Sequence, residues 1–166
     1  MPGAATGRVK SLLHGIVAWT GLLWVLNLAW ETAQLPLYAI WYEANAPYIA
    51  YAVLHCTVGD GLIAAASFAL AAVCLRESDW IKSRPWRGGT IAVAAGLAYT
   101  AFSEWQNVYQ LGSWAYAPTM PLIFGIGLSP LLQWLVLPVA GILLLRFFRG
   151  RQARLQVRKE TRNEAR

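Results

Sequence analysis

Residues 48–75 read YIAYAVLHCTVGDGLIAAASFALAAVCL, a stretch that holds one acidic residue and neither lysine nor arginine. A helix needs about 20 mostly apolar residues to cross a bilayer, so this stretch by itself predicts a membrane span. Three more segments have the same character, at about 11–33, 88–110 and 121–145. We therefore expect an all-α, polytopic membrane protein with four transmembrane helices.

Composition agrees with this fold class. Of the 166 residues, 57% are hydrophobic and 13% are charged, whereas soluble domains average about 45–50% and about 25%. We expect one four-helix transmembrane domain over residues 1–148, followed by a basic tail over 149–166 that is helical only in its first turns. The net charge of +6 does not indicate nucleic-acid binding, because no basic face remains in the apolar segments.

The basic residues also predict orientation. All lysines and arginines fall in residues 8–10, 76–87 and 146–166. Loops rich in these residues stay on the cytoplasmic side, so both termini and the 76–87 loop are expected there. The loops at about 34–47 and 111–120 lack lysine and arginine and are expected on the opposite side. The first apolar segment has no A-x-A-like cleavage site and is interpreted as a retained helix.

Ionisable residues inside the spans are the main functional signal. A charge near the bilayer centre costs at least about 2.5–3.5 kcal/mol, so such residues usually face the interior of a bundle. On the first and third predicted helices the polar side chains recur at helical spacing, which places them on one stripe of each helix. We expect these stripes to meet polar residues of the other two helices in a pocket in the outer leaflet. The stripes are Trp24, Asn27, Glu31 and Gln34, and Thr100, Ser103, Glu104, Asn107 and Gln110; the other two helices add His55 and Asp60, and Ser129 and Gln133.

His55 and Asp60 are five residues apart, which is about 140° around a regular helix. Only one of them can then face the centre of the pocket. Gly59 and Gly61 would permit a π-bulge that brings both side chains inward.

Carboxyl groups in a dry pocket can give and take protons near neutral pH. The candidate catalytic residues are Glu31, Asp60, Glu104 and His55. The candidate substrate-binding residues are Trp24, Asn27, Gln34, Trp105, Asn107 and Gln133. Buried amides also serve as structural hydrogen bonds between membrane helices, and this second interpretation stays open.

Metal and redox chemistry receive less support. His55, Glu31 and Glu104 are the candidate ligands for a divalent metal, but no motif for a metal, a nucleotide or c-type haem is present. Cys56 and Cys74 lie about 27 Å apart along one predicted helix. They cannot form a disulfide with each other in that helix, and no C-x-x-C relay is present.

Three functions fit these features. The first is a membrane-embedded enzyme that performs acid–base chemistry, with or without a metal, on a lipophilic substrate. The second is a small proton-coupled transporter, because Glu31 and its aromatic neighbours resemble the first helix of the small multidrug resistance family. This chain departs from that family in carrying Asp60, Glu104 and His55. The third is an accessory subunit. The lipid bilayer is the expected partner, and a homo-oligomer or a membrane-protein partner stays open.

The strings WETAQLPLY (30–38), HCTVGDGLIA (55–64), FSEWQNVY (102–109), GSWAYAPTMP (112–121) and GLSPLLQW (127–134) span the four predicted helices. They resemble those of uncharacterised bacterial membrane proteins of similar size. The resemblance implies a multi-pass protein of the bacterial inner membrane and brings no activity with it.

Overall fold

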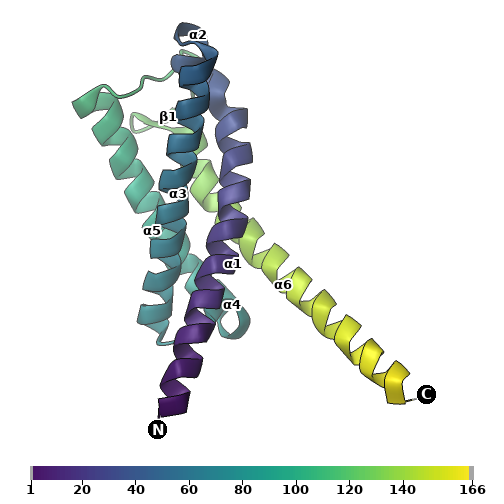
Figure 1. The fold of residues 1–166 in the computed structure, drawn as a ribbon. Coiled ribbons are helices and arrows are strands. Elements are labelled where there is room, and N and C mark those ends of the chain that lie inside the picture. Colours follow the sequence, from purple (N-terminus) through teal and green to yellow (C-terminus); the bar gives the residue numbers. More distant parts are fainter. Residues whose placement is uncertain (1, 165–166) are drawn as a thin grey trace.

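The structure is a computed structural model that describes residues 2–164. It is mostly helical, which confirms the all-α fold class (Figure 1). The long helices are α1 (Pro2–Gln34), α3 (Ala46–Leu75), α5 (Pro85–Trp105) and α6 (Leu128–Glu164). The short elements are η1 (Leu35–Leu37), α2 (Ile40–Glu43), α4 (Trp80–Ser83), the π-helical η2 (Gln106–Leu111) and the strands β1 (Leu122–Ile123) and β2 (Ile126–Gly127).

Three helices are long and apolar enough to cross a bilayer within the described part of the chain. These stretches are Thr6–Leu37, Ala46–Leu75 and Leu128–Gln156. They belong to α1, α3 and α6 and suggest a membrane-embedded protein.

The ends of α3 follow from local sequence. Asn45 caps its first turn, because its Oδ1 accepts a hydrogen bond of 3.0 Å from the backbone N–H of Tyr48. The helix ends at Arg76, which adopts a left-handed conformation with φ 53°. Its backbone N–H caps carbonyls of the last turn.

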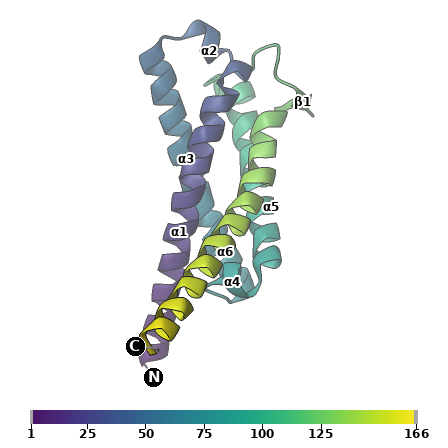
Figure 2. The ribbon, with the colours of Figure 1, turned by 90° about the vertical axis from the view of Figure 1, so that its right-hand side faces the viewer.

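The four long helices pack in a closed ring of neighbours. Helix α1 contacts α3 and α6, and α5 contacts the same two helices. Figures 1 and 2 show α2 and β1 at one end of the molecule and α4 near the other, with the distal part of α6 diverging from the remaining helices.

Aromatic side chains fill the core near the α4 end. Trp19, Phe68 and Trp80 are fully buried, and the centroids of Phe68 and Trp80 are 5.0 Å apart. The indole N–H of Trp19 donates to the carbonyl of Ala64 at 3.1 Å, and that of Trp80 donates to the carbonyl of Phe68 at 3.2 Å. Because both polar groups are satisfied, the cluster carries no desolvation penalty for them.

Glycine allows α5 to approach α6 closely. A Cβ atom at Gly96 would collide with the ring of Trp134, and one at Gly89 would collide with Ile142. The Gly96 contact fixes the position of Trp134 at the floor of the site described below.

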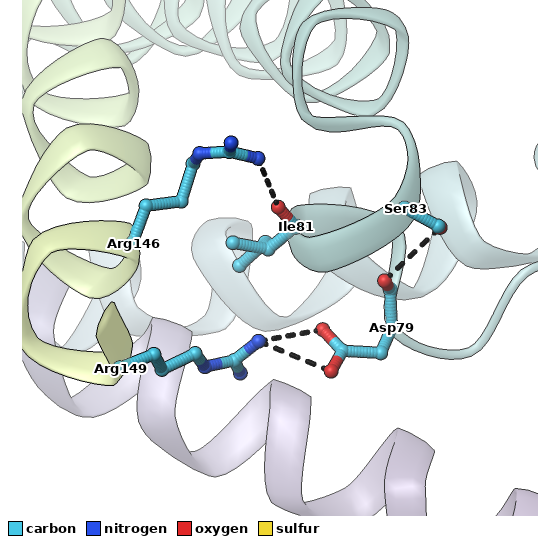
Figure 3. Close-up of polar contacts among 5 residues, drawn as sticks. All are labelled: Asp79, Ile81, Ser83, Arg146 and Arg149. Carbon is cyan, nitrogen blue, oxygen red and sulfur yellow. Dashed lines mark hydrogen bonds and ion pairs between the residues drawn. The ribbon is translucent and has the colours of Figure 1, made fainter. Parts of the chain in front are cut away.

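Polar contacts hold α4 against α6 (Figure 3). Arg149 forms an ion pair with Asp79 at 2.8 Å, and Arg146 donates to the carbonyl of Ile81 at 3.3 Å. Ser83 Oγ donates to the carbonyl of Asp79 at 3.2 Å. These contacts tie the loop between α3 and α5 to α6.

The two loops at the other end pair through their backbones. Ala39 N–H donates to the carbonyl of Ala115, and Ala117 N–H donates to the carbonyl of Leu37, both at 2.9 Å. This short antiparallel bridge joins Tyr38 to Tyr116, and their ring centroids are 5.7 Å apart.

Two expectations about the fourth helix were wrong. It begins at Leu128 rather than near residue 121, and residues 122–127 form an antiparallel hairpin. Phe124 and Gly125 have φ of 49° and 82°, so a right-handed helix cannot run through them. The helix also continues to Glu164 instead of ending after its first tail turns. Residues 165 and 166 of the predicted tail lie outside the described residues.

The π-bulge that Gly59 and Gly61 would permit does not form, since α3 is α-helical throughout. The π-helical segment instead follows α5, over Gln106–Leu111.

Candidate functional site

A cavity of about 460 Å³ lies at the end of the molecule that carries the paired loops. Its walls come from all four long helices and from both loops. All four candidate catalytic residues line it, namely Glu31, His55, Asp60 and Glu104. The structure therefore brings together acids that lie far apart in the sequence.

The side-chain carboxyl groups of Glu31 on α1 and Asp60 on α3 lie close enough to share a hydrogen bond. A carboxylate only accepts hydrogen bonds, so one of the two groups must carry the shared proton. Asp60 is 9% exposed. The pair can therefore hold one proton between two carboxyl groups at the wall of the cavity.

Gln133 on α6 clamps this pair. Its Nε2 lies 2.8 Å from Asp60 Oδ2, 3.1 Å from Glu31 Oε1 and 2.7 Å from Asn27 Oδ1. One amide nitrogen has two protons for these three acceptors, so it shares them. Gln133 is 2% exposed and Asn27 is 1% exposed, and such buried amides need partners.

A second amide extends the network toward the loops. Gln34 Nε2 donates to Glu31 Oε1 at 2.9 Å, and Gln34 Oε1 accepts from Ser129 Oγ at 2.8 Å. Glu31 is thus held by α1 and α6 together, while Asp60 reaches it from α3.

Glu104 on α5 forms a separate acidic station. Tyr116 donates to Glu104 Oε2 at 2.6 Å, and the Tyr38 hydroxyl lies 3.4 Å from both carboxyl oxygens. Tyr116 Oη also accepts a hydrogen bond of 2.9 Å from the N–H of Gly127. The carboxyl group is therefore held from above by both paired loops and by β2.

The two phenols stay protonated and act as donors. Burial raises the pKa of Tyr38, and the nearby Glu104 raises it further. Burial likewise raises the pKa of Tyr116, and its hydrogen bond to Glu104 adds to the shift. Hydrogen bonds donated to a carboxylate favour its charged form, so these phenols suit Glu104 to accept a proton.

Two indole groups complete the polar lining. The buried Nε1 of Trp134 lies toward Asp60 and that of Trp114 lies toward Glu104. Neither makes a hydrogen bond of acceptable geometry in the described structure. Both tryptophans line the cavity.

His55 lies at the rim of the cavity rather than beside the acids. Its side chain is exposed and stacks on Tyr51, with ring centroids 5.7 Å apart. Because α3 is regular, Asp60 faces inward and His55 faces outward, as the 140° separation requires.

Four of the six expected substrate-binding residues belong to the site. Gln34, Asn107 and Gln133 line the cavity, and Asn27 joins the network through Gln133. Asn107 donates to the carbonyl of Ser103 at 2.9 Å.

Trp24 and Trp105 were placed in the site wrongly. Neither belongs to the cavity lining, and they are 38% and 46% exposed. Trp24 packs on Gly61, and the ring of Trp105 lies 6.2 Å from that of Phe102. Trp24 lies only about 20° around α1 from Glu31, but their separation of seven residues places it about 10 Å further along the helix axis.

Sequence reasoning missed Tyr38, Trp114 and Tyr116. Aromatic residues in such loops are typical of the belt at a membrane surface, whereas these three lie beside Glu104. The sequence holds no local signal that the two loops pair with each other.

Among residues 2–164, no three His, Cys, Asp or Glu side chains are grouped closely enough to hold a metal ion. His55, one of the candidate ligands, is exposed at the rim of the cavity and stacks on Tyr51. Cys56 and Cys74 are both free.

No protein-family model matches this chain, and comparisons with curated proteins and with solved structures find no significant similarity.

Proposed function

We propose that this protein is a membrane-embedded enzyme that performs acid–base chemistry on a lipophilic substrate in the outer-leaflet half of a four-helix bundle. In this proposal α5 is the fourth span, both termini are cytoplasmic, and the membrane is the bacterial inner membrane. The distribution of lysine and arginine supports this orientation. It places the paired loops and the cavity on the outer side.

One observation carries the enzymatic proposal. Two acidic stations with different hydrogen-bond partners face the same cavity: the Glu31–Asp60 pair, which can share a proton beside the amide of Gln133, and Glu104, which accepts from two phenols. Carboxyl groups whose surroundings differ in this way can divide the roles of acid and base. Glu31–Asp60 is the proposed proton donor, and Glu104 is the proposed acceptor.

The hydrogen bonds that hold the acids in place support the same roles. Gln133 and Gln34 fix the donor pair from α6 and α1. Tyr116 and Tyr38 fix the acceptor from the loops. A substrate between the stations would meet preoriented groups, and such pre-organisation supplies much of the rate enhancement in acid–base catalysis.

The lining supports a lipophilic substrate. Beside the acids, the cavity presents aromatic and aliphatic side chains, among them Tyr48, Tyr99, Ile63 and Trp134. Ligand sites are typically apolar with a few placed polar groups. No lysine or arginine of the described residues lines it, so an anionic substrate would be repelled.

A deletion strain tests the proposal. Its lipid extract is compared with that of the parent, and the altered lipid species are followed after complementation. Wild type should restore them, whereas Glu31→Gln and Glu104→Gln should not, because the amide keeps size and hydrogen bonding but removes the transferable proton.

Glu43→Gln is the matched control, since Glu43 is exposed on α2 and should restore the profile fully. Folded Glu31→Gln and Glu104→Gln proteins that restore the lipids would contradict the proposal. The acids would then serve packing, and the accessory-subunit interpretation would lead.

A further inference from the structure

The cavity opens on one side, where side chains cover it only in part. Its exposed lining residues are Tyr48, Tyr51, His55, Tyr99 and Ser113. All of them lie on α3, on α5 or directly after η2. Figure 1 shows α5 diverging from α3 toward the end that carries β1 and α2.

The other sides are closed. The Glu31–Asp60–Gln133 network joins α1, α3 and α6, and Trp134 packs on Gly96 between α6 and α5. Above the cavity, the backbone bridge between Leu37–Ala39 and Ala115–Ala117 joins the two loops. The opening between α3 and α5 therefore faces sideways, toward lipid in the proposed membrane orientation.

Two features of the cavity interior determine which head group a ligand can have: its hydrogen-bond acceptors and its hydrogen-bond donor. Asp60 and Glu104 already accept from Gln133 and Tyr116, but a carboxyl oxygen has more than one lone pair and can accept from a further hydrogen-bond donor or attract a cation. The indole N–H of Trp134 needs an acceptor, because this residue is 1% exposed, lines the cavity and has no partner of acceptable geometry.

A hydroxyl group satisfies both requirements, since it donates one hydrogen bond and accepts others. An ammonium group donates but cannot accept. A carboxylate accepts but would be repelled by the acids of the lining.

We infer that the cavity takes a neutral, hydroxyl-headed lipid from the outer leaflet through the opening between α3 and α5. The inference rests on the proposed function, in that it names the class of the lipophilic substrate. The hydroxyl lies between Asp60 and Trp134, and the hydrocarbon tail leaves past Tyr51 and Tyr99.

Three probes with one chain and different heads test the head group: oleyl alcohol, oleylamine and oleic acid. Saturable binding is measured on the full-length protein in lipid nanodiscs, with radiolabelled oleyl alcohol and unlabelled competitors. Oleyl alcohol should bind about one per protein, and oleic acid and oleylamine should each compete at least about tenfold more weakly. Tighter binding of oleylamine or oleic acid, or no saturable binding of oleyl alcohol, would overturn the inference.

Cavity-filling variants test the location. A Cβ atom at Gly59 meets no atom within 4 Å, and Gly59 lines the cavity, so Gly59→Leu should fill it without a clash in the fold. It should weaken oleyl alcohol binding at least about tenfold. Gly21→Leu is the matched control, because Gly21 also has open space around it but lies outside the cavity.

Ala52→Phe, also in the lining, repeats the test if Gly59→Leu does not fold. Unchanged binding in a folded filling variant would overturn the location.

The route is tested with cysteines placed after removal of the native ones by Cys56→Ser and Cys74→Ser. Tyr51→Cys, at the rim, and Val73→Cys, far along the same helix, are modified with pyrene maleimide after folding. Both native side chains are strongly exposed, at 61% and 74%. Association of oleyl alcohol should slow only in the Tyr51→Cys protein, and equal rates would overturn entry between α3 and α5.

The binding assay can reject this inference without rejecting the proposed function, and the reverse also holds. Complementation by Glu31→Gln and Glu104→Gln is measured in cells, on the lipid species that the deletion alters. Oleyl alcohol binding is read on purified protein. Essential acids without alcohol binding would reject the inference alone, and alcohol binding with dispensable acids would reject the enzymatic function alone.

Discussion

Glu31 and Asp60 belong to different helices, yet one amide nitrogen reaches both: Gln133 Nε2 lies 3.1 Å from Glu31 Oε1 and 2.8 Å from Asp60 Oδ2. The two carboxyl groups lie close enough to share a hydrogen bond. Such a pair needs a proton but no cation. This relationship explains how the chain carries two acids at membrane depth, where no lysine or arginine of the described residues lines the cavity. A pair that keeps one proton between two carboxyls leaves a single negative charge to be stabilised by the amides of Gln34 and Gln133.

The pair predicts opposite outcomes for two changes at Asp60. Asp60→Asn keeps an oxygen for Gln133 and offers an N–H to Glu31, so the free energy of unfolding should change by less than about 1 kcal/mol. Asp60→Leu leaves Glu31 and Gln133 without a partner and should cost about 1–3 kcal/mol. Thermal unfolding in detergent compares the variants, and a Leu protein as stable as wild type would argue against the network.

Tyr116 should stabilise the loops more than Tyr38 does. Tyr116→Phe removes the 2.6 Å hydrogen bond to Glu104 and the acceptor for Gly127 N–H, at an expected cost of about 1–3 kcal/mol. Tyr38→Phe removes only contacts of 3.4 Å and should cost less. Hydrogen exchange at the Gly127 amide is the direct measurement, since it should accelerate in Tyr116→Phe and not in Tyr38→Phe.

The same phenols predict a loss of stability at alkaline pH. Burial raises the pKa of Tyr38 and Tyr116 in the folded protein, whereas phenols of the unfolded chain titrate near about 10. Their contribution is complete below about pH 10 and falls as the pH rises toward the folded-state pKa, because the unfolded state loses these protons first. Melting temperatures at about pH 9 to about pH 11 should therefore fall less steeply for Tyr38→Phe/Tyr116→Phe than for wild type. Parallel slopes would contradict this assignment.

Gly96 should tolerate no side chain. A Cβ atom there collides with the ring of Trp134, so Gly96→Ala should destabilise the protein by about 1–3 kcal/mol through overpacking. Gly21→Ala is the matched control, because the space around Gly21 is open and alanine favours a helix by up to about 1 kcal/mol. Thermal unfolding of both proteins measures the difference, and equal effects would show that α5 and α6 can separate freely.

The proposed topology is tested by labelling two exposed serine positions, Ser83 and Ser113. Each is changed to cysteine in a protein that lacks Cys56 and Cys74. A membrane-impermeant maleimide on intact cells should label Ser113→Cys and spare Ser83→Cys, because the lysine- and arginine-rich loop is expected inside. The reverse pattern would invert the orientation, and permeabilised cells, in which both should react, serve as the control.

The sequence by itself predicted the helical fold class, the C-terminal end of α1, the approximate extents of α3 and α5, and the acids that line the cavity. These features are local: a long apolar run predicts a spanning helix, and polar residues three and four apart share a face. Periodicity therefore sufficed to predict that Glu31, Glu104 and Asp60 turn inward, and to show that His55 and Asp60 cannot both do so on a regular helix.

Tertiary structure decided the remainder. Tyr38 and Tyr116 reach Glu104 only because two distant loops pair through their backbones, and no local pattern encodes that pairing. Trp24 and Trp105 share stripes with polar residues yet lie outside the cavity, since the width of a pocket depends on how neighbouring helices cross. The late start of α6 follows from the left-handed turn at Phe124 and Gly125, a conformation that an apolar run with glycines does not reveal. Local hydrophobicity thus determines which segments are helices, whereas contacts between distant segments determine which of their side chains meet.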